Sequence, residues 1–301
     1  MCTPTNLLTK THPSVPGTGT IEIVSASTIV ITGASDGIGA AAARLLRAAL
    51  PDARLVLVGR NPDKTAAIAA ATGAEFHVAD YSRLDDVREL AATLRGLERI
   101  DVLANNAGSM FDGPIRTADG FELTWQVNQL APYLLTNLLL PRLLESRASV
   151  VATSSMASAF LSRFNPEDPE TQRNFSPARA YGNSKLGNVL FTRELHARYH
   201  HRGLNAVAFH PGVIATNFGT ETSGIIHYGY QTAIARTFRP APDGGRNLAY
   251  FVAGTPGIHW ESGRYYNDKR RPGIQRRTSR DPELAQRVFE DAAHALGVTW
   301  E

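Results

Sequence analysis

Residues 28–39 read Thr-Ile-Val-Ile-Thr-Gly-Ala-Ser-Asp-Gly-Ile-Gly, and the alanine-rich stretch IGAAAARLLRAAL continues to residue 50. The β-branched run predicts a short buried strand, and the alanine-rich stretch predicts a helix. The glycines between them indicate a tight turn that leads from the end of the strand into the start of the helix. This strand–turn–helix unit is the beginning of a doubly wound α/β fold.

The same alternation continues along the chain. Short apolar runs at 54–59, 74–80, 100–108, 148–155 and 204–212 alternate with helical patterns at 62–72, 84–95, 119–146 and 179–200. Strands that are apolar on both faces are typical of a parallel sheet covered by helices on both sides. We therefore expect one Rossmann-type domain with three layers, α/β/α, whose functional loops lie at the carboxyl ends of the strands.

Composition sets the boundaries of this domain. The chain has 301 residues, 43% of them hydrophobic and 20% charged, which is ordinary for a globular protein. Residues 1–27 are rich in Thr, Pro and Ser and are expected to form a flexible tail. The catalytic domain should span 28–268, with substrate loops at 156–178 and 217–242, and 269–301 should form a C-terminal extension.

The cysteine content and the net charge indicate the cellular compartment of the protein and the kinds of partner it could bind. The single cysteine, Cys2, cannot form an internal disulfide, and the chain has neither a signal-peptide pattern nor an apolar run long enough to span a membrane. We therefore expect a cytoplasmic protein. The net charge is +3, and a basic cluster at 264–280 occurs without a nucleic-acid motif, so it is read as a solvated face. Nucleic-acid binding by residues 264–287 is kept as a distant alternative.

The glycine loop indicates a phosphate site. Its spacing is G-x-x-x-G-x-G: Gly33 permits the turn, Gly37 lets the backbone approach a ligand, and Gly39 lets the helix pack closely. The N–H groups at the start of the helix would then face a pyrophosphate. The residues expected around the phosphates are Gly33, Ser35, Asp36, Gly37, Ile38 and Gly39.

The end of the second strand bears on the choice of dinucleotide. Arg60 and Asn61 follow this strand, where an acidic residue would bind a ribose 2′-hydroxyl and an arginine would bind a 2′-phosphate. Arg60 favours NADP over NAD. Asp36 argues in the opposite direction, because a basic residue in the glycine loop would have helped to bind the phosphate.

Two further strand ends carry polar residues. Asp80, followed by Tyr81, could accept a hydrogen bond from the adenine amino group or cap the helix that begins near Ser82. Asn106, Ala107 and Gly108 end the fourth strand, where small residues leave room for the ribose and asparagine amides can join neighbouring strand ends.

Tyr181 and Lys185 form the candidate reacting centre. They are four residues apart in a helical stretch and so share one face. A free tyrosine titrates near pH 10, and a nearby ammonium favours its phenolate, which suits acid–base chemistry near neutrality. Ser155 ends the fifth strand and could hydrogen-bond a substrate oxygen, with Ser154 as the competing candidate. Asn128, in the preceding helical stretch, could bond a backbone carbonyl and hold a water near the lysine.

Taken together, the glycine loop, N-N-A-G, the strand-end serine and Y-x-x-x-K make the chain resemble the short-chain dehydrogenase/reductase family from about Thr28 to Asp268. The resemblance implies that Asn128, Ser155, Tyr181 and Lys185 form a catalytic tetrad, with Ser155 rather than Ser154 as its serine. It also implies that His210, Pro211, Gly212, Val213 and Thr216 border the nicotinamide, although His210 by itself reads as a packed or capping residue. No metal is expected.

A closer likeness involves AYGNSKLGNVLFTREL (180–195), FHPGVIAT (209–216) and the long gap between Ser155 and Tyr181. These features resemble the retinol-dehydrogenase-like branch, which implies NADP(H) and a lipophilic alcohol, aldehyde or ketone. The chain lacks the N-terminal anchor of that branch's membrane-bound members, so a ketoreductase is favoured over a retinoid enzyme. The family resemblance also implies a homodimer or homotetramer.

The sequence therefore predicts NADP(H)-dependent reduction of a lipophilic carbonyl, or the reverse reaction, with Tyr181 as general acid/base. An apolar substrate is suggested by Phe160, Phe164, Phe218, Ile225, Ile226 and Tyr230, which could equally be packing residues of a lid. The alternative function is a non-catalytic regulator that binds NAD(P) on the same fold.

Overall fold

The computed structural model describes residues 27–212, 214–215 and 239–301. Strand β1 (Thr28–Thr32) is buried along its whole length, and helix α1 (Gly37–Ala49) follows the glycine-rich turn. The carboxylate of Asp36 caps α1 by accepting a hydrogen bond from the N–H of Gly37. The predicted strand–turn–helix unit is confirmed.

Seven parallel strands form the central sheet, in the order β3-β2-β1-β4-β5-β6-β9. After β1 the strands are β2 (Arg54–Gly59), β3 (Glu75–Val78), β4 (Val102–Asn105), β5 (Ser149–Thr153), β6 (Asn205–Phe209) and β9 (Arg264–Tyr266). The chain moves outward from β1 to β3 and then crosses to β4 on the other side of β1. This reversal leaves a crevice beyond the carboxyl ends of β1 and β4, where doubly wound sheets bind ligands. A separate parallel pair joins β7 (Ile214–Ala215) to β8 (Arg239–Pro240).

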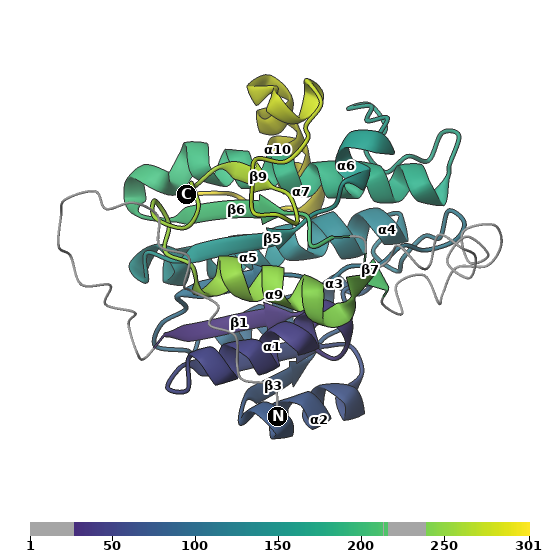
Figure 1. Cartoon of the computed structure of the whole chain (residues 1–301). Coiled ribbons are helices and arrows are strands. Elements are labelled where there is room, and N and C mark those ends of the chain that lie inside the picture. The colour runs from purple at the N-terminus through teal and green to yellow at the C-terminus, as the bar shows by residue number, and fades with distance from the viewer. Residues whose placement is uncertain (1–26, 213, 216–238) are drawn as a thin grey trace, which may run out of the picture.

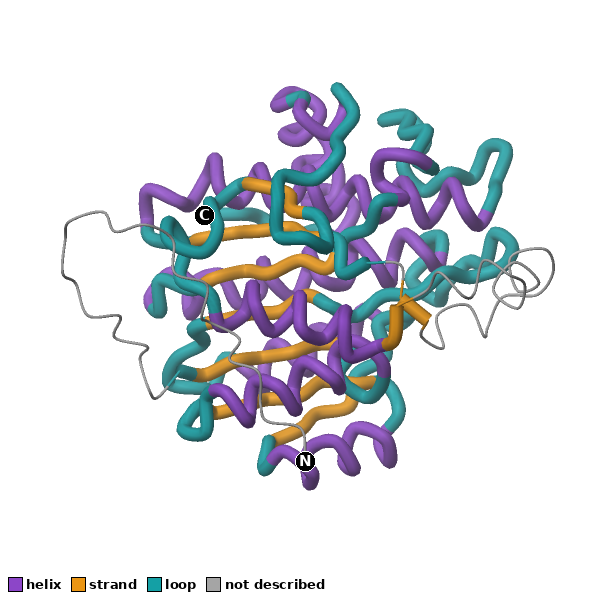
Figure 2. The backbone as a smooth tube through the Cα atoms, in the orientation of Figure 1, coloured by secondary structure: helices purple, strands orange, loops and turns teal. Residues whose placement is uncertain are grey.

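Helices cover both faces of the sheet, so the predicted three-layer fold is confirmed (Figures 1 and 2). One face is covered by α1, α2 (Pro62–Thr72) and α9 (Ala241–Ala253), which share one apolar cluster with the strands. The opposite face is covered by α3 (Leu84–Leu94), α5 (Ala131–Glu145) and α7 (Pro177–Tyr199), which share another. Within the described ranges, no helix combines the length and apolar character that a membrane span requires.

Helix α10 (Pro282–Leu296) packs against α7 on the side away from the sheet. An aromatic cluster joins them: Tyr133 of α5 lies 5.1 Å from the rings of Phe191, Phe289 and Trp300. The indole N–H of Trp300 donates to the Tyr133 hydroxyl at 2.6 Å, and that hydroxyl donates to the carbonyl of Phe289 at 2.6 Å. Residues from 269–301 thus complete part of the main core.

The helix expected at 119–146 is built differently. It begins as the short helix α4 (Leu123–Trp125), passes through the π-helical turn η1 (Gln126–Leu130) and continues as α5. Glu122 caps its start by accepting from the N–H of Trp125 at 2.9 Å. The wider π-turn places Asn128 inside the protein, and such turns often occur at functional sites.

Other elements were not expected from the sequence. They are α9, β9, the short helix α6 (Ala157–Phe160) and the 3₁₀ turns η2 (His200–Arg202) and η4 (Thr278–Arg280). Helix α9 contains a proline and two glycines, so its own propensity is poor. Its stability comes from packing, because a β-carbon on Gly245 would lie 2.5 Å from the β-carbon of Ala41 in α1. Strand β3 is an exposed edge and not a buried strand, with Phe76 41% and Val78 50% exposed.

Candidate active site

The glycine loop forms one end of the site. Gly33 has a φ of +65°, which residues with a β-carbon rarely adopt. A β-carbon on Gly39 would overlap the carbonyl oxygen of Gly33, so this glycine lets α1 approach the loop. These are the roles that the sequence predicted for Gly33 and Gly39. With both glycines in place, the start of α1 packs against the loop and lines the crevice.

Asn106 joins three strand ends beside this loop. Its amide nitrogen donates to the carbonyl of Thr32 at 2.9 Å, and its amide oxygen accepts from the hydroxyl of Thr153 at 3.1 Å. The Thr32 hydroxyl also accepts from the backbone N–H groups of Asn106 and Ala107. Asn105 points elsewhere and donates to Thr136 at 3.0 Å. Asn106 therefore fixes the ends of β1, β4 and β5 relative to one another.

The end of β2 carries the residues expected near the adenosine ribose. Arg60 lines the crevice, and Asn61 caps α2 by accepting from the N–H of Lys64 at 2.9 Å. The ammonium of Lys64 lies 3.0 Å from the carboxylate of Asp36. Lys64 was not expected in the site, because its approach to Asp36 depends on how α2 packs.

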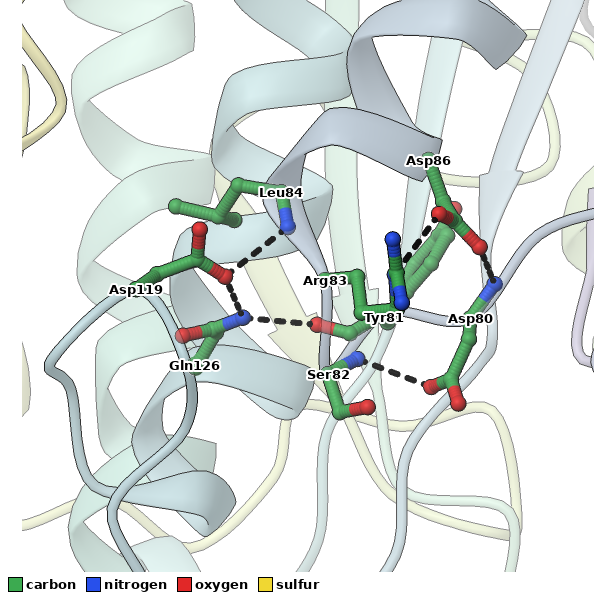
Figure 3. A network of polar contacts seen from close by, with 8 residues as sticks. All are labelled: Asp80, Tyr81, Ser82, Arg83, Leu84, Asp86, Asp119 and Gln126. Atoms are coloured by element: carbon green, nitrogen blue, oxygen red, sulfur yellow. Dashed lines mark hydrogen bonds and ion pairs between the residues drawn. The ribbon is translucent and has the colours of Figure 1, made fainter.

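Asp80 supports the turn that leads into α3 (Figure 3). Its carboxylate accepts from the N–H of Ser82 at 2.9 Å, and its own N–H donates to Asp86 at 3.0 Å. The first N–H of α3, that of Leu84, is satisfied by Asp119 at 2.9 Å. Asp80 thus caps the preceding turn and not the helix itself, and it lines the crevice together with Tyr81.

Tyr181 and Lys185 lie on one face of α7. The Lys185 ammonium is 5.7 Å from the centre of the Tyr181 ring and donates to the carbonyl of Thr153 at 3.0 Å. Only 2% of Lys185 is exposed, and this burial lowers the pKa of its ammonium from 10.5 to about 8. The Tyr181 ring packs with Met110 and Ala157, which fixes its position at the crevice.

The two candidate serines differ in their surroundings. The Ser154 hydroxyl is buried and donates to the carbonyl of Lys185 at 2.7 Å. The Ser155 hydroxyl is partly exposed in the crevice, and its oxygen accepts from the N–H of Ala157 at 3.2 Å. Because the Ser154 proton is already engaged, the geometry favours Ser155 as the group that can donate to a substrate oxygen.

Asn128 lies directly behind the crevice. Its side chain exchanges two hydrogen bonds of 2.8 Å with the backbone of Ser109 and donates to the Ser184 hydroxyl at 3.0 Å. A β-carbon on Gly108 would lie 2.7 Å from the Asn128 amide oxygen and 3.0 Å from the Lys185 ammonium. Gly108 thus lets the Asn128 amide and the Lys185 ammonium approach the same small volume, and Lys185 lines one cavity together with Ser155 and Tyr181.

One cavity of about 1100 Å³ connects the glycine loop with this centre. Most of the predicted residues line it: Gly33, Ser35, Asp36, Gly37, Ile38, Arg60, Asn61, Asp80, Tyr81, Asn106, Ala107, Gly108, Ser155, Tyr181, Lys185, Pro211 and Gly212. Gly39 and Asn128 support the wall from behind. Val213 and Thr216 lie outside the described residues, as do Phe218, Ile225, Ile226 and Tyr230.

Part of the cavity has an apolar wall, which reaches the reacting centre at Met110. It contains Phe160 as expected, and also Met110, Phe111, Ile115, Leu123, Val127, Met156 and Leu161, which sequence reasoning missed. Phe164 does not belong to it and instead packs with Trp125, at 6.0 Å between ring centres. His210 is a buried residue that lines the cavity, and its backbone N–H donates to the carbonyl of Tyr266 at 2.8 Å. Among the residues with described positions, no group of three His, Cys, Asp or Glu side chains could hold a metal ion.

Comparisons with known proteins agree with this geometry. Residues 27–224 match the family model described as short chain dehydrogenase. The chain is 36% identical to a Streptomyces sp. (strain C5) protein named "Putative daunorubicin C-13 ketoreductase", with 99% of both chains covered. It is 33% identical to mouse retinol dehydrogenase 12, over 91% of this chain and 87% of the relative.

A solved structure has a fold similar to that of this chain. It is the crystal structure of an uncharacterized protein from Mycobacterium paratuberculosis, 31% identical to this chain, with a TM-score of 0.72. The match covers 91% of this chain and 95% of that one.

Proposed function

The chain belongs to the short-chain dehydrogenase/reductase family, in its retinol-dehydrogenase-like branch, and from this premise we propose that it reduces a lipophilic ketone or aldehyde with NADPH. The family assignment makes it an oxidoreductase that acts on a CH–OH group with NAD(P). The proposal adds the choice of NADPH, the class of substrate and the roles of individual residues.

The observation that carries the proposal is the position of Ser155, Tyr181 and Lys185 at one end of a cavity whose other end is the glycine loop. A dinucleotide fits this cavity. The cavity has a volume of about 1100 Å³, and the start of α1 contributes Gly37 and Ile38 to its lining, where helix N–H groups would face a pyrophosphate. Arg60 at the end of β2 supports NADP, because a guanidinium pairs well with a phosphate.

In the proposed reaction a bound reduced nicotinamide supplies the hydride. Tyr181 donates a proton to the carbonyl oxygen as negative charge develops there, and the Ser155 hydroxyl hydrogen-bonds the same oxygen. Lys185 holds positive charge beside the phenol, and it would help to hold the nicotinamide ribose of a bound cofactor. Asn128 fixes the backbone at Ser109 and so holds this wall of the site in place.

Two features support a lipophilic substrate. Many of the side chains that line the cavity are apolar, and three of them, Ile115, Phe160 and Leu161, are 46%, 53% and 42% exposed. Exposed apolar side chains around a cavity mouth are typical of a site for an apolar ligand. The relative named for the C-13 ketone of daunorubicin suggests a bulky aromatic ketone. The convergent side chains give the non-catalytic alternative no support.

The experiment is a turnover assay. Purified protein is incubated with NADPH or NADH and a panel containing daunorubicin, retinal, an aryl methyl ketone and a small hydrophilic ketone. We expect oxidation of NADPH with the three lipophilic compounds, which are daunorubicin, retinal and the aryl methyl ketone, and little oxidation with the hydrophilic ketone. Equal turnover of all four would contradict the lipophilic preference, and turnover with NADH alone would contradict the choice of cofactor.

A further inference from the structure

The fold divides the basic cluster at 264–280 into two parts. In the first part, Arg270 packs over the ring of Tyr250, with its guanidinium 4.1 Å from the ring centre. Arg276 is turned toward the loop after α6, where its guanidinium lies 3.5 Å from the carbonyl oxygen of Ser162. These two arginines therefore find partners within the protein.

The second part of the cluster lies beside Arg193, which belongs to α7. Arg264 begins β9 and Arg280 ends the turn η4, and both elements pack against α7. Burial lowers the pKa of the Arg193 guanidinium, and the positive charges of Arg264 and Arg280 lower it further. Cations from three separate elements are thus gathered around one side chain.

Hydrogen bonds hold the chain around these three arginines. The Arg193 guanidinium donates to the side-chain oxygen of Gln275 at 3.0 Å. The N–H of Gly273 donates to the carbonyl of Tyr265 at 2.9 Å, so the segment that leads to η4 folds back along β9. The hydroxyl of the buried Ser279 donates to a backbone carbonyl at 2.8 Å and closes the η4 turn. The arginines are therefore presented by a fixed backbone.

The protein does not compensate this positive charge. In the part of the chain that the structure describes, none of the three arginines forms an ion pair, and the buried Nε–H of Arg193 has no hydrogen-bond partner. Two acidic side chains of α7 and α10, Glu194 and Glu290, are both engaged by Arg198, at 2.6 and 3.1 Å. Like charges held together and a buried unpaired donor both cost free energy. An anionic ligand would offset the charge repulsion.

The three arginines lie apart from the dinucleotide cavity, which none of them lines. Arg193 follows Lys185 by eight residues on α7, which corresponds to about 12 Å along the helix axis. An anion bound here would therefore contact neither the glycine loop nor the reacting centre.

We propose that Arg193, Arg264 and Arg280 form a binding site for a phosphate monoester. Such a group carries nearly two negative charges near neutral pH and has three terminal oxygens, so each guanidinium can pair with an oxygen. A carboxylate, with one charge and two oxygens, would satisfy the three arginines less completely. A soluble phosphate ester and the headgroup of phosphatidic acid both present this group. The inference does not depend on the proposed substrate or cofactor.

His196 provides a local reporter for binding. Burial lowers the pKa of its ring, and the charges of His200, Arg264 and Arg193 lower it further, so the ring senses the same electrostatic field. In an NMR titration of the full chain with glycerol 3-phosphate at constant ionic strength, the His196 ring signals should shift and saturate. The signals are assigned with the variant His196→Gln. Unchanged His196 signals would overturn the inference.

Arg264→Gln tests the site directly, with Arg271→Gln as the matched control. Arg264→Gln should weaken glycerol 3-phosphate about fivefold in the same titration, because one charged hydrogen-bond partner is lost. Arg271 is an exposed arginine of the same segment, and its charge is not among those that lower the pKa of Arg193. Its removal should leave the affinity nearly unchanged. An equal loss in both variants would indicate general attraction to a basic surface and would overturn the inference.

Thermal unfolding separates binding from a structural role. Without the phosphate ester, Arg264→Gln should unfold at the wild-type temperature or above it, because a repelling charge is removed. Adding the ester should stabilise the wild type and Arg271→Gln, because a ligand that binds the folded state raises its stability, but should have little effect on Arg264→Gln. If the ester stabilised all three proteins equally, Arg264 would not belong to its site.

Cosedimentation with phosphatidylcholine vesicles that contain phosphatidic acid distinguishes the two sources of the phosphate. Binding of glycerol 3-phosphate without binding to the vesicles supports a site for a soluble ester. Binding to the vesicles that is lost in Arg264→Gln and kept in Arg271→Gln supports a lipid headgroup. If neither probe binds, the inference is wrong, and the assay of carbonyl reduction is unaffected by that result.

Discussion

The ammonium of Lys185 donates a 3.0 Å hydrogen bond to the carbonyl of Thr153, the last residue of β5. The Asn188 amide donates to the same carbonyl at 3.3 Å, so the strand end holds the face of α7 that carries the lysine. The bond places a buried ammonium next to the Tyr181 ring, 5.7 Å from its centre. The protonation of Lys185 should therefore affect catalysis.

The pH dependence follows from this burial. Because burial lowers the pKa of Lys185 to about 8, the ammonium is present below that pH and lost as the pH rises through it. We expect kcat/KM for carbonyl reduction to fall above about pH 8 in the wild-type enzyme. Lys185→Arg, which stays charged, should be slower but show no decline at this pH. A wild-type profile that stays flat to pH 10 would contradict this role.

Tyr181 is expected to be essential for turnover and not for cofactor binding. Tyr181→Phe keeps the ring that packs with Met110 and Ala157 but removes the proton donor. We expect kcat to fall on the order of 10³-fold while the dissociation constant for NADPH stays within about twofold. Tyr199→Phe, at the far end of the same helix, is the control and should keep full activity. Comparable activity in Tyr181→Phe would require a different acid.

The two serines should separate in a paired experiment. Ser155→Ala removes the hydroxyl that faces the cavity, so kcat/KM should fall about 100-fold with little change in thermal stability. Ser154→Ala removes a buried hydrogen bond to the backbone carbonyl of Lys185, so the free energy of unfolding should fall by about 1 kcal/mol. This variant should keep more activity than Ser155→Ala. Steady-state kinetics and urea unfolding measure both effects. The reverse pattern would make Ser154 the substrate-contacting serine.

Trp300 should matter for stability and not for chemistry. Its indole packs 4.6 Å from the Phe289 ring and donates to Tyr133, so it fastens α10 to α5. Trp300→Ala should lower the free energy of unfolding by about 3 kcal/mol, because a large aromatic side chain leaves the cluster. At a temperature where the variant remains folded, kcat should be unchanged. A drop in kcat without a loss of stability would instead connect α10 to the site.

The sequence predicts the parts of the site that depend on local spacing. The roles of Gly33 and Gly39 depend on a single turn, and the relative position of Tyr181 and Lys185 depends on a single turn of helix. Both pairs could therefore be predicted from their spacing in the sequence. Lys64 could not, because its contact with Asp36 depends on the packing of α2 against Gly59. The apolar wall could not either, since residues 109–127 combine loop, short helix and π-turn without a regular period.

The same distinction explains the missed elements of the fold. Helix α9 is stabilised by close packing of Gly245 on Ala41, a contact between segments about two hundred residues apart along the chain. Strand β3 (Glu-Phe-His-Val) lies at the edge of the sheet, and its position there depends on the order of all seven strands. Neither property is encoded in a short window of residues.

The π-turn at Gln126–Leu130 joins two surfaces that serve different purposes. Before and within it, Leu123 and Val127 line the cavity, and Asn128 bonds the backbone of Ser109 in the cavity wall. After it, the leucines of α5 are turned toward the sheet. Removing one residue from the turn would rotate one surface by about 100° relative to the other. Among single-residue deletions in the segment formed by α4, the π-turn and α5, those in the π-turn should therefore be tolerated least, because they change the relative orientation of the two surfaces.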